Sequence, residues 1–204
     1  MNIFTTSFND VLNLYIYLMK FINHHTCYSG GAEGADSYFE FFAEKYHVSV
    51  VAFSYKTKFH KSENKRELTD DEFKEGVENV LKANEVLKRS KINQYLKFLA
   101  RNWFQVKSAD EIYAVSSLKK VNERLQVKGG TAWAVQMAIN TNKKVFVYNQ
   151  DLAQWFYWDF YQQNFIELKA PPKITSHHFA GIGTRNINIF GINAIEELFK
   201  NTFE

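Results

Sequence analysis

One cysteine, Cys27, stands among the 204 residues of the chain, so no disulfide can form within it. A chain without paired cysteines is typical of a reducing compartment. No apolar run reaches the length of a transmembrane helix, and residues 1–4 lack the basic and apolar segments that open a signal peptide. These absences predict a cytoplasmic protein that has no membrane partner.

The chain also lacks a large excess of positive or of negative residues. The chain has 25 lysines and arginines against 22 aspartates and glutamates, which are interleaved and leave a formal net charge of +3. Nucleic-acid binding draws its affinity from clustered positive charge, so we do not expect a nucleic-acid partner. Hydrophobic residues make up 46% of the chain, which is enough to bury the core of a single domain over residues 1–204.

Motifs for metal binding and nucleophilic catalysis do not stand out. The pairs His24-His25 and His177-His178 begin predicted strands, but no cysteine or acidic residue stands at metal-ligand spacing from them. We interpret them as packing histidines at the end of the sheet opposite the glycine-rich segments. No Ser-His-Asp or Cys-His arrangement stands out, and the sequence predicts neither a metal nor a cofactor.

What the sequence does contain is an alternation of strand and helix patterns. This alternation predicts an α/β fold, in which a mostly parallel sheet carries helices on both faces. The expected strands cover residues 2–6, 25–28, 48–53, 111–115, 144–148 and 178–181, and the expected helices 11–21, 36–45, 70–89, 91–104, 131–140 and 190–199. We interpret 56–68 and 116–128 as loops, and the aromatic run 154–161 with 165–168 as a small β-hairpin.

Three glycine-rich segments lie after predicted strands. Because the carboxyl ends of parallel strands meet at one edge of a sheet, we expect these segments to converge on one crevice. Glycine lets a backbone approach a ligand closely, and the N-terminus of a helix favours phosphate. The sequence therefore predicts a phosphate-bearing ligand. The candidate contacts are Ser29, Gly30, Gly31, Gly34 and Asp36; Lys128, Gly129, Gly130, Thr131 and Trp133; and Gly181, Gly183, Thr184 and Arg185.

Each of these residues also has a structural interpretation. The glycines can serve only as turns at the starts of helices. Asp36 can brace its loop in place of contacting a ribose hydroxyl. Trp133 can pack against the sheet or stack on a base. Arg101 can be an ordinary arginine of a helix surface or contact a phosphate or a ribose. Arg185 can pair with a phosphate through two hydrogen bonds.

The segment Ser29-Gly30-Gly31-Ala32-Glu33-Gly34-Ala35-Asp36 resembles the GGAxGAD signature of the SLOG superfamily of Rossmann-like nucleotide-binding proteins. This superfamily includes the DNA-processing Smf proteins and the "lonely guy" phosphoribohydrolases. Arg101-Asn102, ahead of the strand at 111–115, is similar to the Arg-Asn of stand-alone SLOG proteins. Gly129 to Gln136 is similar to the superfamily's GGTxxA and PGGxGTxxE loops. The resemblance implies a Rossmann-like domain whose ligand is a nucleotide derivative, with Arg101, Asn102 and Gln136 as further contacts.

The chain departs from the phosphoribohydrolases at three positions of the last loop. Gln136 matches their catalytic glutamate, Lys128 matches the proline and Ala132 matches a glycine. A glutamine cannot act as a carboxylate base. The resemblance thus implies a non-catalytic sensor or sequestering protein for an ADP-ribose-type or cyclic nucleotide signal, in bacterial antiphage defence or its inhibition, in a bacterial or phage-infected cytosol. The alternative is a hydrolase of N-glycosidic bonds, with Glu33, Asp36 or Glu123 replacing the missing glutamate.

The aromatic run Trp155–Tyr161 bears on assembly. A small hairpin cannot bury that many aromatic side chains by itself, and exposed apolar patches usually mark contacts. The sequence therefore predicts a homo-oligomer, most simply a dimer.

Overall fold

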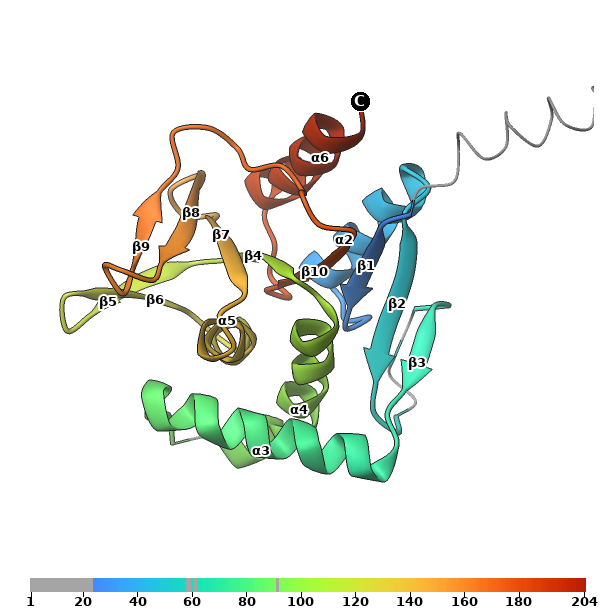
Figure 1. Ribbon diagram of the computed structural model, residues 1–204, viewed down its shortest axis with the longest axis vertical. Helices are drawn as coiled ribbons and strands as arrows, with labels where there is room; N and C mark the ends of the chain where they lie inside the picture. Colours follow the sequence, from blue (N-terminus) through green and yellow to red (C-terminus); the bar gives the residue numbers. More distant parts are fainter. Residues whose placement is uncertain (1–23, 58–59, 61, 91) are drawn as a thin grey trace, which may run out of the picture.

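The structure, a computed structural model, describes residues 24–57, 60, 62–90 and 92–204 (Figure 1). A strand and helix pattern alternates along the chain, as the sequence predicts. The strands of the main sheet are β1 (Thr26–Ser29), β2 (Ser49–Ser54), β3 (Lys65–Glu67), β4 (Glu111–Ser116), β7 (Lys144–Asn149), β8 (Gln154–Asp159), β9 (Asn164–Glu167) and β10 (His178–Gly183). A separate hairpin consists of β5 (Leu118–Val121) and β6 (Arg124–Val127).

The main sheet has eight strands in the order β3-β2-β1-β10-β4-β7-β8-β9. The strands from β3 to β7 in that order pair in parallel, whereas β8 and β9 pair antiparallel. The helices are α2 (Ala35–Lys45), α3 (Asp70–Leu87), α4 (Ile92–Ser108), α5 (Thr131–Asn140) and α6 (Ile189–Phe203). Figure 1 shows α2 and α6 on one side of the sheet and α3, α4 and α5 on the other. The predicted α/β fold, a mostly parallel sheet with helices on both faces, is confirmed.

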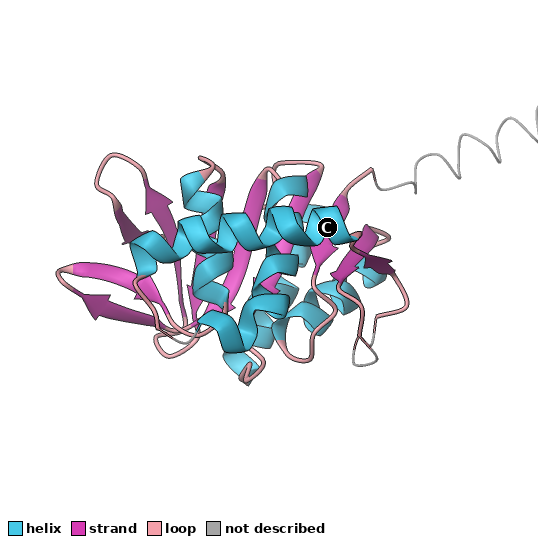
Figure 2. Ribbon diagram, turned by 90° about the horizontal axis from the view of Figure 1, so that it is seen from below, coloured by secondary structure: helices cyan, strands magenta, loops and turns pink. Residues whose placement is uncertain are grey.

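Each helical layer buries its own apolar cluster against the sheet. On the side of α2 and α6 the cluster is built on Phe39, Phe179 and Phe199, each 0% exposed. On the other side Leu99 and Met137 pack on the middle strands, each 1% exposed. Figure 2, turned to look from below, shows helices lying in front of the strands. Burial of large side chains on both faces explains why the inner strands are continuous apolar runs.

The direction in which the chain adds successive strands to the sheet reverses in the middle of the sheet. From β1 it passes through α2 to β2 in one direction, and from β4 it passes through α5 to β7 in the other. Right-handed crossovers then require α2 and α5 to lie on opposite faces, as they do (Figure 1). Strand β10 fills the position between β1 and β4. In open α/β sheets, ligands bind at such a switch point, beyond the carboxyl ends of the strands.

The predicted loops contain two features that the sequence analysis missed. Segment 56–68 includes β3, a three-residue edge strand whose residues are all exposed, so no apolar pattern marks it. Segment 116–128 contains β5 and β6, joined through Asn122 and Glu123 at φ 47° and 67°. Two left-handed residues suit a tight hairpin turn. The strand predicted at 2–6 and the helix predicted at 11–21 lie outside the described residues.

The aromatic run forms the predicted β-hairpin, β8 and β9, and this hairpin extends the main sheet. Strand β8 pairs with β7 over residues 146–149, which buries Trp155 and Phe156 to 3% and 6% exposure. The turn after β8 leaves Phe160 at 40% and Tyr161 at 97% exposure. The uncovered aromatic surface is smaller than the sequence predicts, because the sheet extends through this hairpin.

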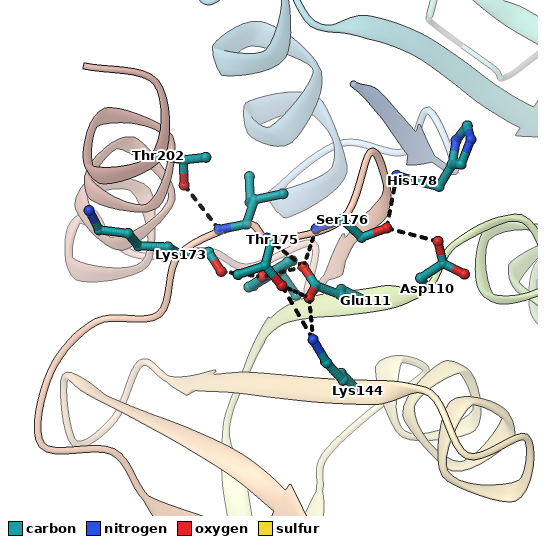
Figure 3. A network of polar contacts seen from close by, with 10 residues as sticks. Asp110, Glu111, Lys144, Lys173, Thr175, Ser176, His178 and Thr202 are labelled. Carbon is teal, nitrogen blue, oxygen red and sulfur yellow. Dashed lines mark hydrogen bonds and ion pairs between the residues drawn. The ribbon is translucent and has the colours of Figure 1, made fainter. Parts of the chain in front are cut away.

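At the amino ends of the strands a buried carboxylate anchors the connection that leads into β10 (Figure 3). Glu111, 1% exposed, accepts hydrogen bonds from the backbone N–H groups of Thr175 and Ser176 at 2.8 and 3.1 Å. The Lys144 ammonium lies 3.0 Å from its Oε1. Burial would raise the pKa of Glu111, but the hydrogen bonds from Thr175 and Lys144 outweigh it and lower the pKa. This network stabilises the sheet at the end opposite the glycine-rich segments.

The histidine pairs lie at this same end. The rings of His25 and His177 are 4.7 Å apart, and Tyr28 Oη lies 3.2 Å from Nδ1 of His178. No group of three or more His, Cys, Asp or Glu side chains is placed to hold a metal ion among the residues that the structure describes. Within the same residues, no helix combines the length and the apolar composition needed to cross a bilayer.

Candidate functional site

A cleft of about 1100 Å³ lies at the switch point of the sheet. It is bounded by the loop after β1, the end of β4, the end of β10 and the N-terminus of α5, with α4 as a side wall. The structure therefore brings parts of all three glycine-rich segments to one place. Of the predicted contacts, Asp36, Arg101, Asn102, Lys128, Gly129, Gly130, Thr131, Trp133, Gly183, Thr184 and Arg185 line this cleft.

The segment at the start of α5 is open to the cleft. Gly129 has φ +65°, and a Cβ built there would meet nothing within 4 Å. Gly130 has helical backbone angles, and its Cβ would meet only Leu99, at 3.8 Å. The N–H groups of Ala132 and Trp133 donate to the carbonyl oxygens of Gly129 and Gly130 at 3.3 and 3.2 Å, and the N–H groups ahead of them lie at the positive dipole end of the helix. This segment can therefore bind an anion with its backbone.

An arginine that the sequence analysis missed holds this segment in place. Arg89 donates to the carbonyl oxygens of Gly129 and Val127 at 2.7 and 2.8 Å. Its guanidinium lies 4.8 Å from the centroid of the Trp133 ring, and Trp133 Nε1 donates to Asn84 Oδ1 at 3.2 Å. Trp133 is 5% exposed, so the packing interpretation describes most of its surface. Arg89 follows the end of α3, and no motif around it marks its role.

The first glycine segment, in contrast, is filled by the protein itself. A Cβ on Gly30 would lie 2.6 Å from Cζ of Arg101, one on Gly31 would overlap the His60 ring, and one on Gly34 would overlap the carbonyl oxygen of Thr184. Gly31 and Gly34 also have positive φ, 60° and 97°. These glycines are needed because other parts of the chain approach them closely.

Asp36 and Arg101 form a buried pair between this segment and the end of β10. Arg101 donates to the carbonyl oxygen of Gly30, and its Nη2 lies 3.6 Å from Oδ2 of Asp36. The other carboxylate oxygen of Asp36 accepts from the Gly183 N–H at 3.1 Å. Burial raises the pKa of Asp36 to about 6, although the Arg101 guanidinium opposes this rise. Asp36 thus braces two loops, which was the structural interpretation of this residue.

Six predicted contacts do not line the cleft. Ser29 is 0% exposed and hydrogen-bonds to Glu40, and a Cβ on Gly181 would overlap Phe39 in the core. Gly30 and Gly34 are covered by the contacts described above, while Gly31 lines a neighbouring pocket. Gln136 lies on another side of α5, where its Nε2 donates to Asn140 Oδ1 at 2.8 Å. The position that matches the catalytic glutamate therefore does not face the cleft.

The neighbouring pocket, which we name the side pocket, has a volume of about 380 Å³. It shares Ala32, Glu33, Phe98, Arg101 and Arg185 with the cleft. The rings of Tyr55 and Phe98 meet edge to face in its wall, with centroids 5.2 Å apart. Tyr55, Phe98 and His60 are not among the predicted contacts, because they lie on a polar loop and an exposed helix face that carry no motif.

Cationic groups surround the open segment. Lys128 is half-exposed, and its Nζ lies 3.3 Å from Oδ2 of Asp151. Arg89 is hydrogen-bonded to the carbonyl oxygen of Gly129. Arg185 is exposed and has no ion pair with any residue that the structure describes. The side chain of Asn102, 8% exposed, borders the cleft from α4. Backbone N–H groups, an amide and these cations together suit a phosphate-bearing ligand.

No protein-family model and no curated protein matches the chain. A solved structure that does match is described as a "Putative molybdenum carrier protein" from Syntrophus aciditrophicus SB. It is 19% identical, the match covers 85% of this chain and 93% of that one, and the TM-score is 0.45. At that TM-score the likeness carries no weight for the ligand or for the superfamily, and the fold is established by the sheet order itself.

Proposed function

We propose that this chain is a stand-alone member of the SLOG superfamily that binds a nucleotide-derived small molecule and does not cleave it. The observation that carries the proposal is the open glycine pair at the start of α5, at the switch point of the sheet, in a cleft that Lys128 and Arg185 also line. In this proposal the phosphates lie against the N-terminus of α5, where backbone donors and the helix dipole favour negative charge.

The cavities favour a ligand of the ADP-ribose or cyclic nucleotide class. The cleft and the side pocket are contiguous through shared lining residues and have volumes of about 1100 and 380 Å³. The Tyr55–Phe98 pair offers aromatic surface to a base in the side pocket, which shares Arg101 and Arg185 with the cleft. A nucleotide signal held in this way would be sensed or sequestered in the cytosol of a bacterium or a phage-infected cell.

The arrangement of carboxylates supports binding without turnover. Cleavage of a glycosidic bond develops positive charge on the sugar, which a nearby carboxylate stabilises. Asp36 lines the cleft, but Arg101 and Gly183 engage its two oxygens. Glu123 pairs with Lys120 at 2.8 Å in the β5–β6 turn and does not line the cleft. Gln136 supplies no charge, and it faces away from the cleft.

One observation favours the alternative, hydrolysis of an N-glycosidic bond. The pKa of Asp36 is raised to about 6 by burial, so this carboxyl group can exchange a proton near neutral pH. Glu33 is an exposed carboxylate that also lines the cleft. A hydrolase would use this pair in place of the glutamate that Gln136 replaces.

Calorimetry tests binding, and chromatography tests cleavage. The titration panel consists of ADP-ribose, cyclic ADP-ribose, NAD, AMP and cyclic dinucleotides. We expect one of them to bind and to be recovered intact. If the folded protein binds none of them, the proposal is wrong. If AMP or ADP-ribose releases free base over multiple turnovers, and Asp36→Asn or Glu33→Gln abolishes this release, the chain is a hydrolase.

We also propose that the chain forms a homo-oligomer, most simply a dimer. The support is the exposed pair Phe160 and Tyr161 in the turn after β8. Light scattering at tens of micromolar should give twice the mass of one chain, and the mass of a single chain would disprove the proposal.

A further inference from the structure

A second cavity, which we name the amide cavity, lies on the other side of α5. Its volume is about 630 Å³, and it is enclosed by α5, the end of α3, the β5–β6 hairpin and the β8–β9 hairpin. Figure 1 shows these two hairpins on the same side of α5. The amide cavity and the cleft share no lining residue. It is therefore a separate site, and its interpretation does not depend on the proposed function.

The polar lining of the amide cavity consists almost entirely of carboxamides. No aspartate, glutamate, lysine or histidine lines it, and Arg124 is its one charged side chain among the residues that the structure describes. A carboxamide offers both donors and an acceptor, so it suits a neutral partner that offers the same. The carboxamides come from two turns, a strand, a helix and the loop after it: Asn122, Gln126, Gln136, Asn140, Asn142 and Gln163.

The carboxamides on α5 keep hydrogen-bonding capacity. The bond of 2.8 Å between Gln136 and Asn140 uses Nε2 of the first and Oδ1 of the second. Oε1 of Gln136 and Nδ2 of Asn140 are left, one an acceptor and the other a donor. Gln136 is half-buried, and Asn140 is exposed at the rim.

Aromatic rings form another wall of the amide cavity. Trp158 and Phe165 meet edge to face, with ring centroids 5.1 Å apart, and Phe160 lies beside them. These side chains offer ring surface on which a flat ligand can stack.

We propose that the amide cavity binds a neutral nitrogen heterocycle of the nucleobase class, as a free base or a nucleoside. The edge of a base carries donors and acceptors in one plane, which a carboxamide can pair with through two hydrogen bonds. Its π-face stacks on aromatic side chains. The absence of lysine and the single arginine make the cavity unsuitable for a phosphate, in contrast to the cleft.

Calorimetric titration with adenosine, guanosine, cytidine and uridine tests this site, and the tryptophan fluorescence is followed in parallel. We expect at least one nucleoside to bind. Gln136→Leu should weaken that binding by about five- to tenfold, because it removes one hydrogen-bonding partner of the base. Trp158→Ala should weaken it by about as much, because it removes part of the aromatic wall. Asn140→Ala, at the exposed rim, provides a variant that does not disturb the core. Melting temperatures establish that each variant is folded.

The matched control is Gly130→Asp, which alters the cleft and leaves the amide cavity unchanged. Nucleoside binding that survives Gly130→Asp and falls with Gln136→Leu or Asn140→Ala would support the amide cavity as the site. If no nucleoside binds at millimolar concentration, or if binding is lost in Gly130→Asp and kept in the other variants, the proposal is wrong. Binding of glucose or maltose in place of every nucleoside would also overturn it.

Discussion

Two glycine-rich segments border the same cleft, and they differ in what occupies the space above them. In the first, Gly30, Gly31 and Gly34 are each covered by another part of the protein. In the second, Gly129 and Gly130 face open space. Both patterns look alike in the sequence, since both place glycines ahead of a helix. The first segment is packed against other parts of the protein, and the second is open to the cleft.

Two arginines that line the cleft differ in the same way. Arg101 is 7% exposed and is used by the protein itself, in contacts with Gly30 and Asp36. Arg185 also lines the cleft, but it is exposed and forms no ion pair with any residue that the structure describes. A buried arginine with an internal carboxylate partner maintains structure, whereas an exposed arginine beside open backbone donors can pair with a phosphate.

The largest expected effect comes from placing a methyl group in each segment. Gly34→Ala should lower the free energy of unfolding by about 3 kcal/mol or more, because φ is +97° and the Cβ would overlap a backbone carbonyl. Gly130→Ala should change it by less than about 1 kcal/mol, since its backbone is helical and the space is free. Urea denaturation measures both. Equal effects in the two variants would show that the segments do not differ.

The second prediction concerns pH and the first segment. The pKa of Asp36 is raised from 3.8 to about 6 on folding, so the folded chain holds this proton more tightly than the unfolded chain. Its stabilising contribution is complete below pH 3.8, is lost as the pH rises through 6, and amounts to about 3 kcal/mol. The unfolding free energy of the parent, minus that of Asp36→Asn, should therefore fall as the pH rises from 4 to 6.5.

Arg101, Glu40 and the Gly183 N–H face this carboxyl group, and all of them remain in Asp36→Asn. Subtracting the two pH profiles therefore isolates Asp36. Parallel profiles of the parent and the variant over this range would mean that Asp36 titrates as a solvent-exposed aspartate does, and that the first segment is not a buried brace.

The third prediction concerns the charge of the open segment. Gly130→Asp should weaken nucleotide binding on the order of a hundredfold, because a carboxylate at the start of α5 repels a phosphate. The matched variant Gly130→Asn has the same shape without the charge and should retain most of the affinity. Calorimetry with the nucleotide that the panel identifies measures both variants. Undiminished binding by Gly130→Asp would show that this glycine pair is only a turn.

The smallest effect is expected from the exposed arginine. Arg185→Ala should weaken nucleotide binding by about tenfold and leave the melting temperature unchanged, as removal of one charge-assisted hydrogen bond does. Arg101→Ala should lower the melting temperature, because it leaves Asp36 buried without its cation. A stable Arg101→Ala variant with weakened binding would show that Arg101 contacts the ligand and does not stabilise the fold.

The sequence predicted the class of the fold because hydrophobic periodicity is local. Strands β2, β4 and β7 are apolar runs, and α3 begins with Thr69 and Glu72 in a capping box that places acidic residues in its first turn. It did not predict β3, because a short exposed edge strand has no apolar period. It placed the cleft correctly at the carboxyl ends of the strands, since topology follows from the alternation of elements.

The amino-acid sequence by itself determined the α/β fold, the positions of the glycines and the absence of a glutamate at position 136. Only the tertiary structure decided which glycines are covered, since the groups that cover Gly30 and Gly34 come from Arg101 and Thr184, distant along the chain. The tertiary structure also turned Gln136 toward the amide cavity and brought Arg89 under Gly129. The physical reason is that the groups covering a glycine, and the cavity that a side chain faces, depend on contacts between segments far apart in sequence. Local sequence patterns do not record such contacts.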